Sequence, residues 1–350
     1  MFSLIRPYIF TLDPETAHNL AIKSLKFNFL PQNIFAVENE EILKTTLFGK
    51  DINNPIGLAA GFDKNAEVYN EILNLGFGFT EVGTVTPKKQ YGNQKPRVFR
   101  LKRDNALINR LGFNNDGSDI IKKRIENNIP NGVLGINIGP NKNTADRVND
   151  YLECFRRFHH LANYLTINIS SPNTENLRDF HGKEQLKELI NAINSEKNSL
   201  NSKIPIAVKL SPDLSHKQIE IVSEILLENN IDIAVISNST DKNREKLTNI
   251  NKLEKGGLSG KPIEKISNKI INRFYNLIGK KIKIIGVGGA DSAESVYEKI
   301  LNGATLVQLY TGMVYKGPQI ADKINKGLVK ILEKDGIKNI GDVVGSKKSA

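Results

Sequence analysis

Amide side chains interrupt two runs of the sequence that otherwise have the composition of buried strands. The stretch INISSPNT, residues 167–174, carries Asn168 between two isoleucines and then continues into hydroxyl and amide residues. Asn137 stands in a matching Ile-Asn-Ile setting. Because an amide both donates and accepts hydrogen bonds, such positions suit a flat heterocycle with alternating N–H and C=O groups.

Two lysines stand where a positive charge needs a partner. Lys209 lies in Ala-Val-Lys-Leu, a run we expect to be covered on both faces, where an unpaired ammonium is costly. Its stem could instead extend to the end of the strand, which would still direct the charge into a site there. Lys64 follows Asp63, which we expect to cap a helix through residues 65–69. A lysine in a first turn opposes the helix dipole, so we expect an anionic group near Lys64.

The elements that must position these residues are short apolar runs rich in β-branched residues, most of them separated by helical patterns. Eight such runs alternating with helices predict a (β/α)8 barrel. A doubly wound sheet is the alternative, and the absence of G-x-G-x-x-G after the first run weakens it. Asp291 and Glu294 have the spacing of a capping box before one helix, and Gly303 would end it. The runs are 56–60, 79–85, 133–138, 164–170, 204–210, 231–237, 282–287 and 306–310, and the clearest helical patterns are 184–195, 215–229 and 292–301.

Polar residues fall at the C-terminal ends of these runs, which is where a barrel carries its chemistry. One such residue would be a satisfied core polar group. Six positions converging on one rim favour a ligand site over six separate structural roles. The positions are Gly61 to Lys64, Gly83 with Thr84, Asn137, Asn168, Lys209 with Leu210, and Ser237 to Ser239.

Glycine clusters follow the last three runs, at residues 256–260, 286–289 and 310–312. Loops need glycine in any case, so each cluster alone says little. Together they match the phosphate-binding loops after strands seven and eight of many barrels. A phosphate, an anionic group near a lysine and several amides would accommodate flavin mononucleotide (FMN) and a pyrimidine-like substrate.

Composition narrows the remaining choices. The net charge of +11 fits nucleic acid, an anionic membrane surface or small anionic ligands, although the lysines are scattered as on an ordinary basic surface. The single cysteine, Cys154, excludes a disulfide framework and indicates a reducing compartment. The five histidines show no ligand spacing, so we expect no metal site. No apolar stretch is long enough to span a bilayer, and the start lacks a secretory signal.

The first 40 residues differ from the rest. FSLIRPYIF predicts a short helix, and Asp13-Pro14 predicts the N-cap and first residue of a second one. The second helix carries an apolar stripe of Ala17, Leu20, Ala21 and Leu25. The pair could be a hairpin docked on the main domain or an interfacial membrane device.

These motifs coincide with a known family. The chain resembles dihydroorotate dehydrogenase, specifically the quinone-linked, membrane-associated class. The resemblance implies a (β/α)8 TIM barrel over residues 41–342, an N-terminal two-helix extension over 1–40 for membrane and quinone access, and a tail at 343–350. The matching stretches are LAAGFDK (58–64), EVGTVTP (81–87), PRVFR (96–100), NRLGFNN (109–115), INISSPNT, GGLSG and GVGG.

The resemblance also implies which residues bind ligands. One FMN per chain would be contacted by Ala60, Gly61, Lys64, Thr84, Asn137, Asn168, Lys209, Ser237, Gly260, Gly289, Tyr310 and Thr311. Dihydroorotate or orotate would be held by Lys64, Asn109, Arg110, Leu111, Gly112, Phe113, Asn168, Asn173, Asn238 and Ser239. The quinone head would lie near His18, Arg100 and Tyr310. Ser237 and Ser239 depart from the family, which has threonine there, but both keep the hydroxyl.

In the resembling family, the residue at the position of Ser171 removes the substrate C5 proton while hydride leaves C6 for the flavin. A serine is a weak base, so it needs desolvation and a hydroxyl or water relay. The family's cytosolic class has cysteine at this position, so Ser171 favours the membrane class. Lys209 would stabilise the anionic reduced flavin.

The resemblance implies oxidation of (S)-dihydroorotate to orotate in de novo pyrimidine biosynthesis, with a ubiquinone-type quinone as final acceptor. It implies a monomer or weak dimer without a nucleic-acid partner, held peripherally on an anionic membrane surface, the cytoplasmic face of the inner membrane. Three alternatives remain: a tRNA dihydrouridine synthase, which needs a cysteine over the flavin; a Schiff-base aldolase using Lys64 or Lys209; and a non-catalytic phosphate-ligand or nucleic-acid binder.

Overall fold

The computed structural model describes residues 2–27, 40–279 and 281–347. Residues 28–39 of the expected extension and 348–350 of the expected tail lie outside the described residues.

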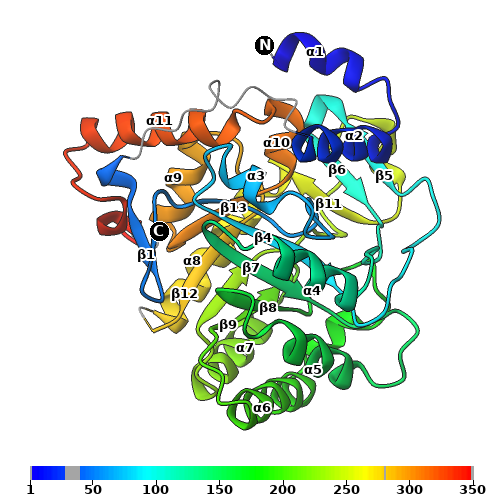
Figure 1. Cartoon of the computed structure of the whole chain (residues 1–350). Helices are drawn as coiled ribbons and strands as arrows, with labels where there is room; N and C mark the ends of the chain where they lie inside the picture. Colours follow the sequence, from blue (N-terminus) through cyan, green and yellow to red (C-terminus); the bar gives the residue numbers. More distant parts are fainter. Residues whose placement is uncertain (1, 28–39, 280, 348–350) are drawn as a thin grey trace.

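Eight parallel strands close into a barrel, which confirms the fold expected from the alternating runs (Figure 1). Around the barrel the order is β3, β4, β7, β8, β9, β10, β12 and β13, and β13 pairs with β3 to close it. Some strands are shorter than the expected runs by one or two residues at the C-terminal end. There the last residues of the run leave the hydrogen-bonded sheet and enter the loops of the site. The strands are β3 (Ile56–Leu58), β4 (Phe79–Val85), β7 (Val133–Ile138), β8 (Tyr164–Asn168), β9 (Ile206–Leu210), β10 (Ile233–Ile236), β12 (Lys283–Val287) and β13 (Leu306–Leu309).

Helices surround the barrel, and the largest core cluster lies between the two layers. Inside the barrel, inward-pointing side chains such as Phe79, Tyr164 and Ile233 fill the space, as the double-sided burial of parallel strands requires. The surrounding helices are α3 (Tyr69–Leu73), α4 (Ser118–Asn127), α5 (Arg147–Phe158), α6 (Lys183–Ser199), α7 (His216–Glu228), α8 (Glu264–Ile278), α9 (Ala293–Leu301), α10 (Thr311–Lys316) and α11 (Ile320–Lys334).

Two expectations about helix ends were wrong. Helix α9 is capped by Ser292, whose hydroxyl accepts from the Ser295 amide, and not by an Asp291–Glu294 box. Asp63 does accept two amide hydrogen bonds, from Glu67 and Val68 at 2.8 Å, but the helix begins only at Tyr69. Lys64 therefore lies in a turn and not in a helical first turn.

Smaller elements cover the ends of the barrel. An antiparallel sheet of β5 (Val98–Leu101), β6 (Ala106–Asn109) and β11 (Gly257–Gly260) lies near the N-terminal helices in Figure 1. A second sheet pairs β1 (Thr45–Leu47) with β2 (Lys50–Ile52). The 3-10 helices are η2 (Glu41–Leu43), η3 (Lys102–Asp104), η4 (Leu177–His181), η5 (Ile250–Leu253), η6 (Lys261–Ile263) and η7 (Ile340–Val343).

The chain begins with two helices, α1 (Phe2–Ile9) and α2 (Pro14–Lys26), as expected. Asp13 caps α2 by accepting the Glu15 and Thr16 amides at 3.0 Å. The expected apolar stripe on α2 is only half correct. Ala17 and Leu25 are buried, whereas Leu20 and Ala21 face solvent.

No helix in the described parts of the chain is both long and apolar enough to cross a membrane.

Candidate active site

Three side chains form a hydrogen-bonded network at the C-terminal ends of neighbouring strands. Thr84 on β4 donates to the Asn137 amide oxygen on β7 at 2.6 Å. The Asn168 amide on β8 donates to Thr84 Oγ1 at 2.9 Å and to the Asn137 oxygen at 3.1 Å. Because all three are buried, each fixes the orientation of the next. The two Ile-Asn-Ile positions therefore meet, as the sequence predicts.

A buried carboxylate supports this network from below. Glu81 on β4 accepts from Asn137 at 2.8 Å, from Tyr164 at 3.0 Å and from Gln308 at 2.9 Å. Thr166 adds a fourth donor at 3.2 Å. Sequence reasoning missed this role of Glu81. The signal was available, since a glutamate inside the buried run FTEVGTV raises the same question as Lys209.

Lys209 and Lys64 bring positive charge to the cavity above this network. Burial lowers the pKa of Lys209, and the nearby Glu81 carboxylate opposes that shift. Burial also lowers the pKa of Lys64 to about 8, while the charges of Glu15 and Asp63 raise it and that of Arg97 lowers it. Both amines therefore favour an anionic ligand as a partner.

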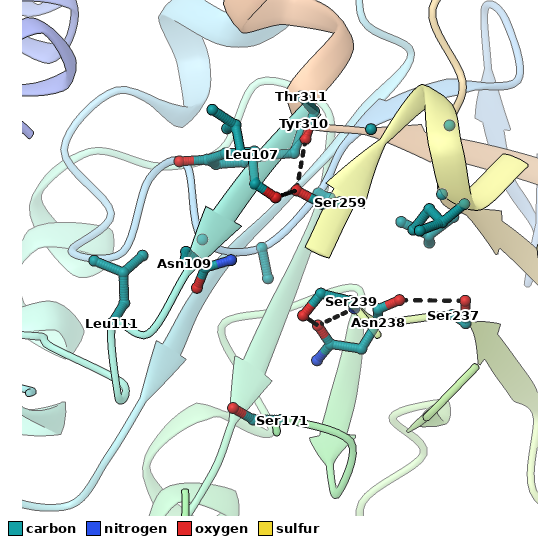
Figure 2. Close-up of a pocket in the computed structure, with 18 of the residues that line it drawn as sticks. Leu107, Asn109, Leu111, Ser171, Ser237, Asn238, Ser239, Ser259, Tyr310 and Thr311 are labelled. Carbon is teal, nitrogen blue, oxygen red and sulfur yellow. Dashed lines mark hydrogen bonds between the residues drawn. The ribbon is translucent and has the colours of Figure 1, made fainter. Parts of the chain in front are cut away.

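One cavity at this end of the barrel, called the main cavity below, encloses about 1260 Å³ of space, its open mouth included. In Figure 2, Asn109, Ser171, Asn238 and Thr311 surround the same space from different sides. Most sequence-predicted residues line it: Ala60, Gly61, Lys64, Thr84, Asn109, Leu111, Gly112, Phe113, Asn168, Ser171, Asn173, Lys209, Ser237, Asn238, Ser239, Gly260, Gly289, Tyr310 and Thr311. Others that the sequence did not single out also line it, among them Leu107, Lys261 and Ile263, and so does Ser259 of the expected 256–260 glycine cluster.

Four predicted residues do not line this cavity. Asn137 lies beneath it, hydrogen-bonded to Thr84 and Glu81. Arg110 turns outward, where its guanidinium donates to Glu254 at 2.7 Å and covers the ring of Phe99. The remaining two lie near the N-terminal helices: His18 lines a cavity beside α2, and Arg100 contacts the connection between α1 and α2.

Ser171 stands at the loop after β8, with its side chain almost fully buried. Its hydroxyl accepts from the Asn173 amide at 3.2 Å, and no imidazole or carboxylate within the described residues is hydrogen-bonded to it. The Asn173 side chain donates to the Asn109 side chain at 3.3 Å, which joins this loop to the end of β6. Ser171 is thus desolvated, as a weak base must be, and it lacks an adjacent stronger base.

The opposite end of the cavity is built from glycine backbone. A Cβ on Gly289, whose φ is +77°, would lie 2.5 Å from the Glu264 Cβ. A Cβ on Gly260, at φ +99°, would lie 2.8 Å from the Thr311 methyl group. Thr311 and Ser259 hydroxyls are 2.9 Å apart beside these glycines. Close backbone approach with hydroxyl donors fits a phosphate group.

A second cavity lies beneath α2 and shares walls with the first. Lys64, Val98, Leu111 and Tyr310 line both. His18 lines the second cavity, where burial, with a contribution from the Lys64 charge, lowers its pKa to about 3. A neutral imidazole therefore faces this space at physiological pH.

Arg100 stands apart from His18 and Tyr310. Its guanidinium donates to the Leu12 carbonyl at 2.8 Å and lies over the Phe10 ring at 4.7 Å. The side chain thus contacts the connection between α1 and α2, and it does not line the cavity that holds His18.

Cys154 lies on α5, buried against β4, with its Sγ 3.9 Å from the Val85 carbonyl. Burial raises the pKa of its thiol well above the usual value. It does not line the main cavity, so it cannot act as the cysteine that a tRNA dihydrouridine synthase requires over its flavin. Among the described residues no group of three or more His, Cys, Asp or Glu side chains could hold a metal ion.

Comparison with known proteins matches this architecture to one family. A family model described as "Dihydroorotate dehydrogenase" matches residues 42–332. The "Dihydroorotate dehydrogenase (quinone)" of Bartonella henselae is 45% identical over 339 residues, covering 96% of this chain and 93% of the relative. The protein of the same name from Bartonella tribocorum is 46% identical over 342 residues, covering 96% and 94%.

Solved structures agree. The crystal structure of DHODH from Eimeria tenella in complex with ferulenol superposes with a TM-score of 0.91 at 36% identity, covering 95% of each chain. The ligand-free form from the same organism gives a TM-score of 0.92, covering 97% of this chain and all of that one. A match over most of the chain, in sequence and in fold, shows that this protein belongs to the dihydroorotate dehydrogenase family.

Proposed function

We propose that this protein is a flavin-dependent, quinone-linked dihydroorotate dehydrogenase of pyrimidine biosynthesis, which oxidises (S)-dihydroorotate to orotate. Family membership supports the reaction, since the named relatives carry this activity in their names. The observation in this chain that carries the proposal is the single cavity that collects Ser171, Lys64, Lys209 and the amides of Asn168 and Asn238. Those groups suit an anionic pyrimidine lying on a flat redox ring.

FMN is the proposed flavin, one per chain. Its phosphate would lie against Gly260, Gly289 and Thr311, where backbone approaches closely. Its ring would lie toward the Thr84–Asn137–Asn168 network and Lys209, with Ala60, Gly61, Ser237 and Tyr310 completing the site. When bound, such a flavin supplies the acceptor for the two electrons and the hydrogen that leave substrate C6, and it passes the electrons to a quinone.

Substrate would be held by the groups around Ser171. The carboxylate of dihydroorotate would pair with Lys64, and the ring amides would pair with Asn109, Asn168, Asn173 and Asn238. Ser239 would add a hydroxyl, while Leu111, Gly112 and Phe113 would exclude water. Arg110 would hold the loop of residues 110–113 in place from outside the cavity, through its hydrogen bond to Glu254.

Ser171 is the proposed base. Its Oγ takes the proton released when the C5–H bond breaks and the C5–C6 double bond forms, and its own hydroxyl proton passes to a neighbouring hydroxyl or water. Burial of Ser171 removes the competing solvent and strengthens this step. Lys209, with Glu81 beneath it, places fixed positive charge where negative charge develops.

The quinone is proposed to enter beneath the N-terminal helices. We divide the chain into an access extension at 1–40, a barrel at 41–342 and a tail at 343–350. His18 and Tyr310 face the cavity under α2, and Arg100 would act from the α1–α2 connection. A monomer or weak dimer would lie on the cytoplasmic face of the inner membrane, with anionic lipid complementing the net charge of +11.

The visible absorption spectrum before and after anaerobic dihydroorotate tests the function. We expect purified protein to show an oxidised flavin band that bleaches with substrate and returns with a quinone. Protein that is colourless and takes up no FMN would refute the flavin proposal, and a band that survives dihydroorotate would refute the substrate.

Ser171→Ala tests the base. The variant should retain flavin and bind orotate, because among the described residues the Ser171 side chain makes a single hydrogen bond, in which it accepts from the Asn173 amide. Its flavin reduction under single-turnover conditions should slow by roughly 10²- to 10⁴-fold, the usual contribution of general base catalysis. Reduction at the wild-type rate would remove Ser171 from this role.

A further inference from the structure

Arg178 joins the loops that follow three successive barrel strands. It lies on η4, directly after the loop that carries Ser171. Its Nε donates to the Ser170 carbonyl after β8 at 3.1 Å, and its Nη2 donates to the Ser239 carbonyl after β10 at 3.0 Å. Its Nη1 donates to Asp213 after β9 at 3.0 Å. Arg178 does not line the main cavity, so it acts on the site through other residues.

The two carbonyls belong to residues next to or within the proposed site. Ser170 precedes Ser171, and its hydroxyl accepts from Asn238 at 2.9 Å and donates to Asn168 at 2.9 Å. Ser239 lines the cavity itself. Both carbonyls have left the strand ladder, so they need a donor from elsewhere. A guanidinium can reach both carbonyls and a carboxylate at once because its donors form a rigid, planar fork.

A carboxylate fixes the direction of the guanidinium. Asp213 is almost buried, and its second oxygen accepts from the Thr240 hydroxyl. Burial raises the pKa of Asp213, while the Thr240 hydrogen bond and the Arg178 charge lower it. Asp241 lies farther out, 3.4 Å from Arg178, and is half exposed. Asp213 is therefore the partner that orients Arg178.

We infer that Arg178 is a positioning residue for the oxidation of dihydroorotate, which rests on the function proposed above. Through the Ser170 and Ser239 carbonyls it holds the base-bearing loop and the substrate-binding loop at a fixed separation. Its loss leaves Ser171 and the cofactor contacts chemically intact but moves the base relative to substrate. A displacement of about 1 Å can lower a rate by 10²-fold.

Separate half-reactions of the holoenzyme test the inference. Arg178→Gln should lower the rate constant of flavin reduction at saturating dihydroorotate by roughly 10- to 100-fold. It should retain FMN and reoxidise with quinone within about twofold of wild type. Arg178→Lys keeps the charge but not the fork, so its rate should fall by a smaller factor. Arg156→Gln is the matched control, since Arg156 forms a two-pronged pair with Glu196 on the barrel exterior.

Asp213→Asn provides a second route in case Arg178→Gln folds poorly. It should reproduce the slow flavin reduction. The double variant Arg178→Lys with Asp213→Asn should slow flavin reduction by less than the product of the two single-variant factors, because the two residues act as one unit. The inference is overturned if Arg178→Lys and Asp213→Asn both reduce flavin within twofold of wild type, or if both half-reactions fall equally. Ser171→Ala, measured alongside, separates the two claims. Rapid flavin reduction by Ser171→Ala would remove Ser171 as the base. Slow flavin reduction by Ser171→Ala, together with wild-type flavin reduction by the Arg178 variants, would remove only the positioning role.

Discussion

At the scale of single residues, Lys64 combines a functional position with a sensitive charge. Lys64 lines both cavities, and burial is the largest cause of its lowered pKa. Glu15 and Asp63 favour the charged form, whereas Arg97 opposes it. The proposed carboxylate of the substrate would add a further negative charge, so ligand binding should raise the pKa of Lys64.

Orotate binding should therefore weaken at high pH. Lys64 is protonated below about pH 8 and loses its charge above that value, so the affinity of the oxidised holoenzyme should fall by up to about tenfold per pH unit above 8. Titration of the flavin absorbance with orotate between pH 6.5 and 9.5 measures this. Lys64→Gln should bind weakly at every pH, and Lys142→Gln, an exposed lysine, should follow wild type. An affinity that is constant across this range would contradict the assignment.

Residue types predicted the site better than residue orientations did. Asn168, Asn137 and Lys209 interrupt apolar runs, so a position in a ligand site could be predicted for them from the sequence alone. Arg110 lies in the right loop but turns outward to Glu254, a contact 144 positions away in sequence. Glu81 also interrupts an apolar run, so its position carried a signal, but its partners on other strands could not be foreseen. Arg178 escaped prediction because its role depends on partners in the loops after other strands, which no local pattern records.

At the scale of elements, a largely buried ion pair helps to attach helix α2 to the body of the protein. Arg97 is buried, and its Nε donates to both carboxylate oxygens of Glu15, at 3.1 and 3.0 Å. Its Nη2 donates to Oε1 of Glu15 at 2.8 Å. Glu15 also lines the cavity that holds His18. This ion pair therefore positions the roof of the proposed quinone site.

Glu15→Gln should separate the two half-reactions. Loss of the carboxylate leaves Arg97 underpaired and loosens α2, so quinone-driven flavin reoxidation should slow by roughly tenfold, an expectation based on the cost of truncating a largely buried pair. Flavin reduction by dihydroorotate should stay within about threefold. Stopped-flow measurements at pH 6.5 keep Lys64 protonated in the variant. Lys26→Gln, which breaks the exposed pair with Glu67, is the control. Equal losses in both half-reactions would show that α2 has no separate role.

The contact between α8 and α9 contains a fully buried lysine that the mechanism does not use. Lys299 donates to Ser267 at 3.1 Å and to Asn268 at 2.8 Å. Burial lowers its pKa to about 7, against an opposing effect of Glu264. Between pH 7 and 10.5 the unfolded chain holds a proton that the folded chain lacks, so this group makes stability rise with pH.

Lys299→Met should remove that dependence. The free energy of unfolding of wild type relative to the variant should rise by up to about 1.4 kcal/mol per pH unit above pH 7, and it should be lowest at acid pH. Denaturant titrations from pH 6 to 9.5 measure the difference, with exposed Lys330→Met as control. A difference that does not change with pH would mean that Lys299 keeps its proton in the folded protein.

At the scale of the whole molecule, the barrel was predictable because every strand repeats the same signal. Each run is apolar on both faces and ends in a polar or glycine-rich loop, so errors at single ends do not change the closed sheet. The N-terminal helices were less predictable. Their apolar residues face solvent in places, since Leu20 and Ala21 on α2 are exposed. The prediction assumed that apolar residues on a helix lie on its buried face, and this assumption is wrong for a helix that also carries apolar residues on its exposed face.

Helix α1 is the clearest case of such a surface. It has no buried residue among those described, and Leu4 and Tyr8 are 75% and 77% exposed. An exposed apolar helix on a chain with a net charge of +11 combines the two features that favour an anionic lipid surface. Arg6 anchors the helix through the Tyr315 carbonyl at 3.0 Å, so α1 is held against the body of the protein.

The protein should therefore co-sediment with vesicles that contain anionic phospholipid, and less so as salt rises. Leu4→Ser combined with Tyr8→Ser should weaken binding by at least about tenfold, because two large apolar side chains no longer leave water. The variant should keep dihydroorotate-driven flavin reduction, since α1 lies outside the active-site cavity. Ile129→Ser removes an equally exposed apolar side chain, 80% accessible after α4, and should leave vesicle binding unchanged. Equal binding by all three proteins would show that charge alone, and not α1, brings this molecule to a lipid surface.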